Sequence, residues 1–174
     1  MFNPVTYFQS LKETLKATKN DFFFGKSTSL SHLEDLLNNQ RKHENFFIVQ
    51  HVADGVTVSS GSGFFDKKSC VVFILKKYNI HDQDDRDTKL QECKQIQRSI
   101  ESRLLIDSKK EQPLFYLNKE RMPYYELPGF FAAGTCGLYM VVSWEDPKDL
   151  CYDSTEWEEN TPPTTPPEDE QSGE

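Results

Sequence analysis

The sequence lacks the features that mark several large classes of protein. No apolar run approaches the ~18 residues that a membrane-spanning helix needs, and the N-terminal stretch MFNPVTYFQSLKETLK has neither a basic start nor the apolar core of a secretion signal. There is also no basic patch of the kind that binds nucleic acid. We therefore expect a protein that is made in the cytoplasm, with no membrane partner and no sequence-specific nucleic acid partner.

Paired cysteines and catalytic signatures are missing as well. The sequence has four cysteines and no CxxC motif; the cysteines are Cys70, Cys93, Cys136 and Cys151. We interpret them as small buried hydrophobic residues in a reducing compartment, because a disulfide framework would require an oxidising route. None of the four histidines lies in a local sequence signature that would mark it as the general base for a nucleophilic cysteine. We expect no enzyme activity and no cofactor.

Basic residues are absent from the end of the chain. The sequence has 28 acidic and 20 basic residues, and the eight acidic residues after Tyr152 are accompanied by no Lys or Arg. The body is therefore neutral, and the net charge of −8 lies in the tail. The tail contains TPPTTPPEDEQSGE, which cannot bury enough apolar surface to offset the entropy of ordering. We predict that residues 153–174 form a disordered, acidic, proline-rich tail.

One long amphipathic stretch dominates the body. It follows an apolar run, Val71–Leu75, that is typical of a buried strand. Apolar residues then recur at gaps of three and four, at Leu90, Cys93, Ile96, Ile100 and Leu104. Aspartates at the start of the stretch can cap free N–H groups. The pattern predicts a helix from Asp85 to Ile106 that packs across a sheet.

Two shorter helices are expected near the N-terminus. Residues 3–17 have an apolar stripe at helical spacing. A second helix is predicted to begin at Ser29 or Ser31, since serine is a favourable N-cap residue. Between the two helices, residues 22–25 are either a short strand or an apolar loop.

The periodicity changes to that of strands from Asn45 onward. Asp54-Gly55 between two β-rich runs predicts a hairpin, and Asp66-Lys67-Lys68 predicts a second turn. Three antiparallel strands would then precede the long helix. Three more strands are predicted after it, at residues 113–117, 124–127 and 134–144.

The predicted order of elements is α, α, β, β, β, α, β, β, β. It favours an α+β fold in which a mostly antiparallel sheet carries one long helix on a face, with two N-terminal helices. We expect residues 1–44 to form an N-terminal helical segment packed on the body. Residues 45–152 would form the α+β core domain, followed by the tail.

The loop IHDQDDRD is the main candidate for a metal site. Its potential ligands for Ca²⁺ or Mg²⁺ are His81, Asp82, Asp84, Asp85 and Asp87. The loop does not match an EF-hand, because Arg and Asp stand at the fifth and sixth positions, where Asp or Asn and then Gly are needed. An acidic helix start explains the loop without a metal, so we assign no metal here, although binding stays open.

Adjacent aromatic residues are frequent. Neighbours in a strand face opposite sides, so a pair requires cover on both sides, from the core or from a partner. Phe130-Phe131 follows Pro-Gly and precedes small residues, and it is either a core plug beneath a loop or a contact for another chain. Trp144, and Trp157 in the acidic tail, are further candidate assembly contacts.

The order of elements resembles that of the tail-terminator and tail-completion (neck) proteins of tailed bacteriophages. The matching segments are Val71–Tyr78, Asp84–Leu105, the region around Pro128-Gly129, and Leu138–Trp144. The resemblance covers about residues 45–152 and rests on pattern, with no diagnostic motif. It implies a non-enzymatic structural protein of the virion, a homo-oligomeric ring that joins edge to edge and contacts neighbouring tail or neck proteins.

Two other classes of function stay open. One is a monomeric cytosolic binding module or small enzyme that uses a groove between helix and sheet. The other is an assembly chaperone or adaptor that acts through its acidic tail. The mass in solution separates these alternatives from a ring.

Overall fold

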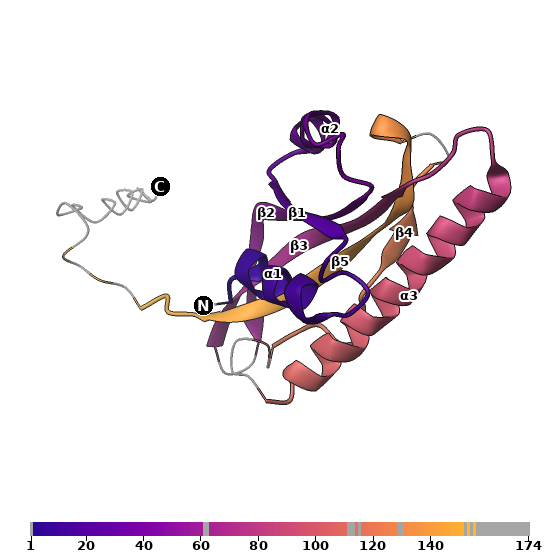
Figure 1. The fold of residues 1–174 in the computed structure, drawn as a ribbon. Coiled ribbons are helices and arrows are strands. Elements are labelled where there is room, and N and C mark those ends of the chain that lie inside the picture. Colours follow the sequence, from indigo (N-terminus) through magenta and orange to yellow (C-terminus); the bar gives the residue numbers. More distant parts are fainter. Residues whose placement is uncertain are drawn as a thin grey trace, which may run out of the picture.

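The structure is a computed structural model that describes residues 2–60, 63–110, 114, 116–128, 131–151, 153 and 155. It is an α+β fold built on a mixed five-stranded sheet of order β1-β2-β3-β5-β4 (Figure 1). The elements are α1 (Pro4–Thr14), β1 (Phe22–Ser27), α2 (Leu30–Asn39), β2 (Asn45–Ser60), β3 (Gly63–Lys77), α3 (Gln83–Asp107), β4 (Tyr124–Glu126), η2 (Ala132–Gly134) and β5 (Thr135–Lys148). The predicted α+β class is confirmed. Most of the predicted acidic tail lies outside the described residues.

The segment around Phe22 is a strand and belongs to the same sheet as the rest. β1 runs parallel to β2, with Phe22 beside Asn45 and Ser27 beside Gln50, whereas the β2–β3, β3–β5 and β4–β5 pairs are antiparallel. Parallel neighbours need a crossover connection, and α2 provides it. The N-terminal 44 residues therefore contribute a strand to the core sheet as well as two helices.

The hairpin predicted at Asp54-Gly55 is wrong. β2 continues through this point with a register irregularity between His51 and Gly55, and β3 continues through the predicted turn at Asp66. A β-bulge accommodates extra residues in one strand without reversing the chain. Two long strands therefore replace the three short ones, and they form an arm that extends past the end of β1.

Two more boundaries differ from prediction. Leu117 makes an isolated bridge to Trp144, in place of the continuous strand predicted over residues 113–117. β5 does not end before Pro147, which still pairs with Phe65 of β3. Proline is tolerated there because it lies near the strand end, where few ladder hydrogen bonds are lost.

The sheet is covered by different helices on its two faces. α1 and α3 pack on one face, around Phe8, Phe47, Ile74 and Ile100, and Figure 1 shows them side by side across the strands. A second, smaller apolar cluster lies on the opposite face, where Leu33 and Leu37 of α2 meet strand residues. The alternation of adjacent phenylalanines in β1 and β2 follows from this two-sided core.

The three predicted helices are present, although α3 begins at Gln83, two residues before the predicted Asp85, and α1 ends at Thr14, before the predicted end at residue 17. The side chains of Asn3, Ser29 and Asp82 accept hydrogen bonds from the first turns of α1, α2 and α3, respectively. The predicted stripe of α3 is confirmed, since all five of its apolar residues are buried. Burial of five such side chains contributes on the order of 7–15 kcal/mol before entropy is subtracted. No helix among the described residues is long and apolar enough to cross a membrane.

Candidate functional site

The predicted assembly contacts occupy different environments. Trp144 is buried. Its ring and that of Phe2 meet edge to face with 4.9 Å between the ring centroids, and its Nε1 donates a hydrogen bond to Asp146 at 3.3 Å. It is therefore part of the core, and the prediction that it docks on a neighbour is corrected. Phe131 is half-buried against the second apolar cluster. Phe130 and Trp157 lie outside the described residues.

A row of aromatic residues crosses the sheet on the face that carries α2. Tyr125 of β4 stacks on Tyr139 of β5 with 5.1 Å between ring centroids, and Tyr139 meets Phe73 of β3 at 5.6 Å. Strand pairing continues the row to Ile48 of β2 and Gly25 of β1. A methyl group at Gly25 would lie 3.0 Å from Leu36, which shows how closely α2 approaches this end.

The other end of that row has no helix over it among the described residues. α2 packs over β1 and against η2, on the β1 side of the sheet. Beyond it, Val71, Tyr139 and Val141 are only half-buried, and Tyr125 at the edge is 47% exposed. We call these four residues the open face. A half-exposed apolar surface of this kind is a candidate contact with another molecule.

Two exposed apolar side chains lie on opposite faces of the arm, which is formed by residues 55–60 of β2 and 63–69 of β3. Val56 is 62% exposed and Phe64 is 46% exposed. On the face that carries Phe64, the side chains of Asp66, Lys68, Asp146 and Lys148 form ion pairs of 3.1–3.5 Å. The hydrogen bond from Lys68 to Asp146 raises the pKa of that lysine. The arm is thus tied to β5, while the outer side of its β2 strand stays open.

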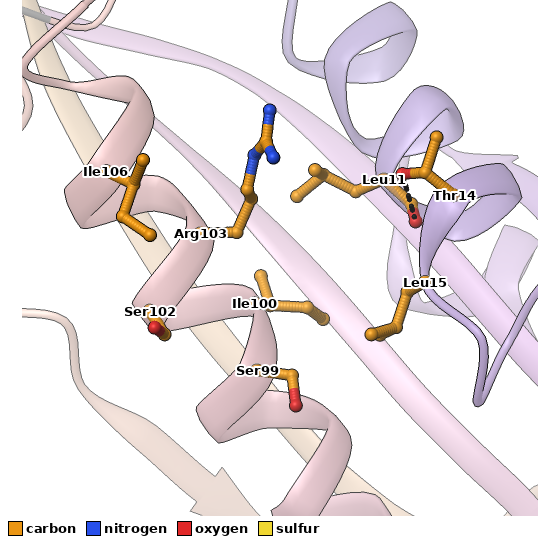
Figure 2. A pocket seen from close by; sticks show the side chains of 8 residues that line it. All are labelled: Leu11, Thr14, Leu15, Ser99, Ile100, Ser102, Arg103 and Ile106. Atoms are coloured by element: carbon orange, nitrogen blue, oxygen red, sulfur yellow. Dashed lines mark hydrogen bonds between the residues drawn. The ribbon is translucent and has the colours of Figure 1, made fainter.

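A groove of about 320 Å³ separates α1 from α3 (Figure 2). Leu11, Leu15 and Ile100 point toward one another across it, and hydroxyl groups such as that of Ser99 lie along its wall. Toward the start of α3 a second hollow shares Ser99 and continues past Lys76. The groove matches the position that a small-molecule binding module would use.

Buried polar contacts close one end of this groove. Asp107 is 3% exposed and accepts hydrogen bonds from the hydroxyl of Tyr7 at 2.8 Å and from Nε of Arg103 at 2.7 Å. The bond from Tyr7 connects α1 to the last turn of α3, and the bond from Arg103 lies within α3. A buried carboxylate paired in this way holds the two helices together, and its acceptor oxygen is already engaged.

The buried thiols do not have the environment of nucleophiles. Burial raises the pKa of Cys70, and it raises the pKa of Cys93 to about 12. Cys136 shifts in the same direction for the same reason. A catalytic cysteine needs the opposite shift, because the thiolate is the reactive form.

The loop predicted as an alternative metal site is a capped helix start. Asp82 accepts from the N–H groups of Asp84 and Asp85, and Asp85 accepts from the N–H of Asn79 at 2.8 Å. Asp87 accepts from Gln83 at 3.0 Å. Within the described residues, no group of three or more metal-ligating side chains converges.

Addition of Ca²⁺ or Mg²⁺, or of a chelator, is expected to leave the melting temperature unchanged. The reason is that three of the loop aspartates already accept hydrogen bonds from the chain itself. Thermal denaturation with and without each divalent ion checks this. A rise of several degrees would mean that the folded state binds the ion and would restore the metal interpretation.

No protein-family model matches the chain, and no curated protein matches it significantly. The sites must therefore be judged on their geometry.

Sequence reasoning missed the open face and the outer edge of the arm. The pair Tyr124-Tyr125 was visible as adjacent aromatics, but nothing local showed that α2 stops short of it. Gly55 was assigned to a hairpin turn and the residues after it to the second strand of that hairpin, since the irregularity in β2 leaves no clear sequence signal. The exposure of the open face depends on where α2 ends, and the exposure of the arm edge depends on where β1 ends.

Proposed function

We propose that this protein is a non-enzymatic structural component of a tailed phage or prophage, a ring-forming tail terminator or head–tail connector (neck) protein. The observation that carries the proposal is the open face. Burying half-exposed Val71, Tyr139 and Val141 together with Tyr125 stabilises an assembly, whereas leaving them in water serves no purpose in a monomer. Its occupant in this proposal is a second copy of the chain.

The arrangement of elements supports the same proposal. α3 follows directly after β3, starts at an acidic loop and packs across the sheet, and the last strand, β5, lies beside β3. This is the layout that the resemblance to tail-terminator proteins implies. A head-to-tail contact between identical subunits closes into a ring when the rotation allows. Within the virion, the ring would contact neighbouring tail or neck proteins.

Replacement of Tyr125 by glutamate tests the contact. The charge would stand on the rim of the open face and would have to be buried without a partner on assembly. We expect the particle mass, measured by light scattering, to fall well below that of a ring, and rings to disappear from electron micrographs. The melting temperature of the subunit should change little, because Tyr125 is an edge residue.

Tyr124→Glu is the matched control. Tyr124 is 50% exposed, close to Tyr125, but it pairs with Met140 and so lies on the opposite face of the sheet. We expect this variant to assemble like the wild type. Equal loss of mass in both variants would show that charge at β4 is the cause and would remove the open face from the proposal. A wild-type protein that is strictly monomeric at high concentration would refute the ring.

The groove between α1 and α3 supports one alternative, a monomeric binding module. Its volume, its apolar floor and its wall of hydroxyl groups fit a small ligand. This alternative predicts a monomeric wild type and no effect of Tyr125→Glu on the mass. The same light-scattering experiment therefore decides between the two functions.

A further inference from the structure

A strand edge lies open along the arm. β1 pairs with β2 only as far as Gln50, and among the described residues no strand pairs with the outer side of β2 from Gly55 to Ser59. Such an edge presents unpaired N–H and C=O groups that another strand can bind. Natural sheets usually protect exposed edges with charged residues, proline or a short strand length.

The arm edge has no charged residue or proline of its own, and the nearest charge is Lys148 of β5, whose Nζ donates a hydrogen bond to Oγ1 of Thr57 at 3.0 Å. The valines and threonine of the edge sequence, GVTVS, favour extended structure. Val56 is 62% exposed. By contrast, β4 at the opposite edge of the sheet has only three residues and lies between Pro123 and Pro128. One edge of the sheet is therefore protected and the other is able to pair.

We propose that the arm edges of two copies of this chain pair antiparallel about a two-fold axis, with Thr57 facing Thr57 of the second copy. Val56 of each copy then faces Val58 of the other, and Gly55 faces Ser59. The second copy is the occupant because the strand is complementary to itself: the valines of the two copies face each other, and the Lys148 that hydrogen-bonds Thr57 in each copy is paired with Asp66 of its own chain at 3.5 Å.

β1 limits the length of this pairing. Ser27, the last residue of β1, lies beside Gln50, and β2 is irregular between His51 and Gly55. An incoming strand paired with Gly55–Ser59 therefore lies beyond the last residue of β2 that pairs with β1. Pairing over only five residues makes the contact weak and dependent on concentration.

The two-fold contact does not rest on the proposed ring, because it leaves the open face free. If both contacts form, two rings related by two-fold axes give a closed dihedral assembly. If only the arms pair, the product is a dimer. In either case, loss of the arm contact halves the mass of the particle.

Disulfide trapping tests the register. In a Cys151→Ser background, which removes the exposed cysteine and leaves Cys70, Cys93 and Cys136 buried, Thr57→Cys places two thiols opposite each other across the axis. Oxidised glutathione accepts two electrons as the thiols lose two protons and form the intermolecular disulfide. Ser59→Cys is the matched control, because Ser59 is also exposed on the arm but faces Gly55.

Thr57→Cys is expected to yield covalent dimer at least about tenfold faster than Ser59→Cys, since only the residue on the axis meets its own copy at disulfide distance. Thr57→Lys should halve the particle mass, because the introduced lysines would face each other across the axis beside Lys148, which donates a hydrogen bond to Thr57 in the wild type, and the melting temperature shows whether the subunit stays folded. Thr57→Val should keep the wild-type mass. Equal trapping of both cysteine variants, or an unchanged mass for Thr57→Lys, would overturn the proposal.

These outcomes separate the arm contact from the open face. Loss of mass with Thr57→Lys but not with Tyr125→Glu would retain the two-fold contact and refute the ring. The reverse pattern would retain the ring and refute the two-fold contact.

Discussion

Ile100→Asp is expected to unfold the protein. Ile100 is 1% exposed and lies in the main apolar cluster, where α3 meets the sheet and α1. An aspartate there would be charged and unpaired, or protonated with its polar groups unsatisfied, and both states are costly. We expect a loss above about 4–5 kcal/mol, which is comparable to the total stability of many domains.

The far side of the same helix provides the control. Gln91 is exposed, and Gln91→Asp should cost less than about 1 kcal/mol, since only helix propensity changes. Ile100→Val, which keeps the site apolar, should cost about 0.5–1.5 kcal/mol. Urea denaturation followed by circular dichroism measures all three variants. Equal tolerance of aspartate at Gln91 and Ile100 would contradict the orientation of α3.

The helix layer is the part of the fold that the sequence predicts best. The stripe that includes Ile96 and Ile100 depends on a spacing of three and four, which is a local property of the chain. The cap at Asn3 is local as well and is found where it is expected, whereas α3 is capped by Asp82, two residues before the first aspartate expected to cap it. Short-range chemistry is enough to position these elements.

The sheet is predicted less well because its pairing is not local. Asp54-Gly55 has the composition of a tight hairpin turn, yet β3 pairs with residues on both sides of it and β2 absorbs the extra length as an irregularity. The parallel placement of β1 beside β2 depends on the crossover through α2, and nothing in Phe22–Ser27 alone specifies a neighbour. A β-rich pattern predicts strands without predicting their partners.

The candidate surfaces show the same limit. Trp144 suggested an exposed contact because aromatic residues are frequent in interfaces, but Phe2 covers it. Tyr125 became a candidate only once its neighbours were known, because its exposure results from where α2 ends. Burial is decided by elements far away in the sequence, so sequence reasoning identified aromatic pairs without saying which of them are free.

Gly137→Ala is expected to destabilise the protein more than a single methyl group normally does. Gly137 lies in β5 with φ of 149°, a value that L side chains rarely adopt. A Cβ atom built there would lie 2.1 Å from the carbonyl oxygen of Ile74 and 3.0 Å from Cα of Leu75. Both atoms belong to the backbone of the central strand β3, so neither can move aside as a flexible side chain would.

The strained backbone costs about 1–3 kcal/mol and the clash adds to it, so we expect a total loss above about 3 kcal/mol. Gly63→Ala is the matched control, because a Cβ atom at Gly63 meets nothing within 4 Å, and its effect should stay within about 0.5 kcal/mol. Thermal denaturation of both variants measures the difference. If Gly137→Ala melts at the wild-type temperature, then β5 does not approach β3 as closely as described, and the central strand pair on which both proposed contacts depend would have to be redrawn.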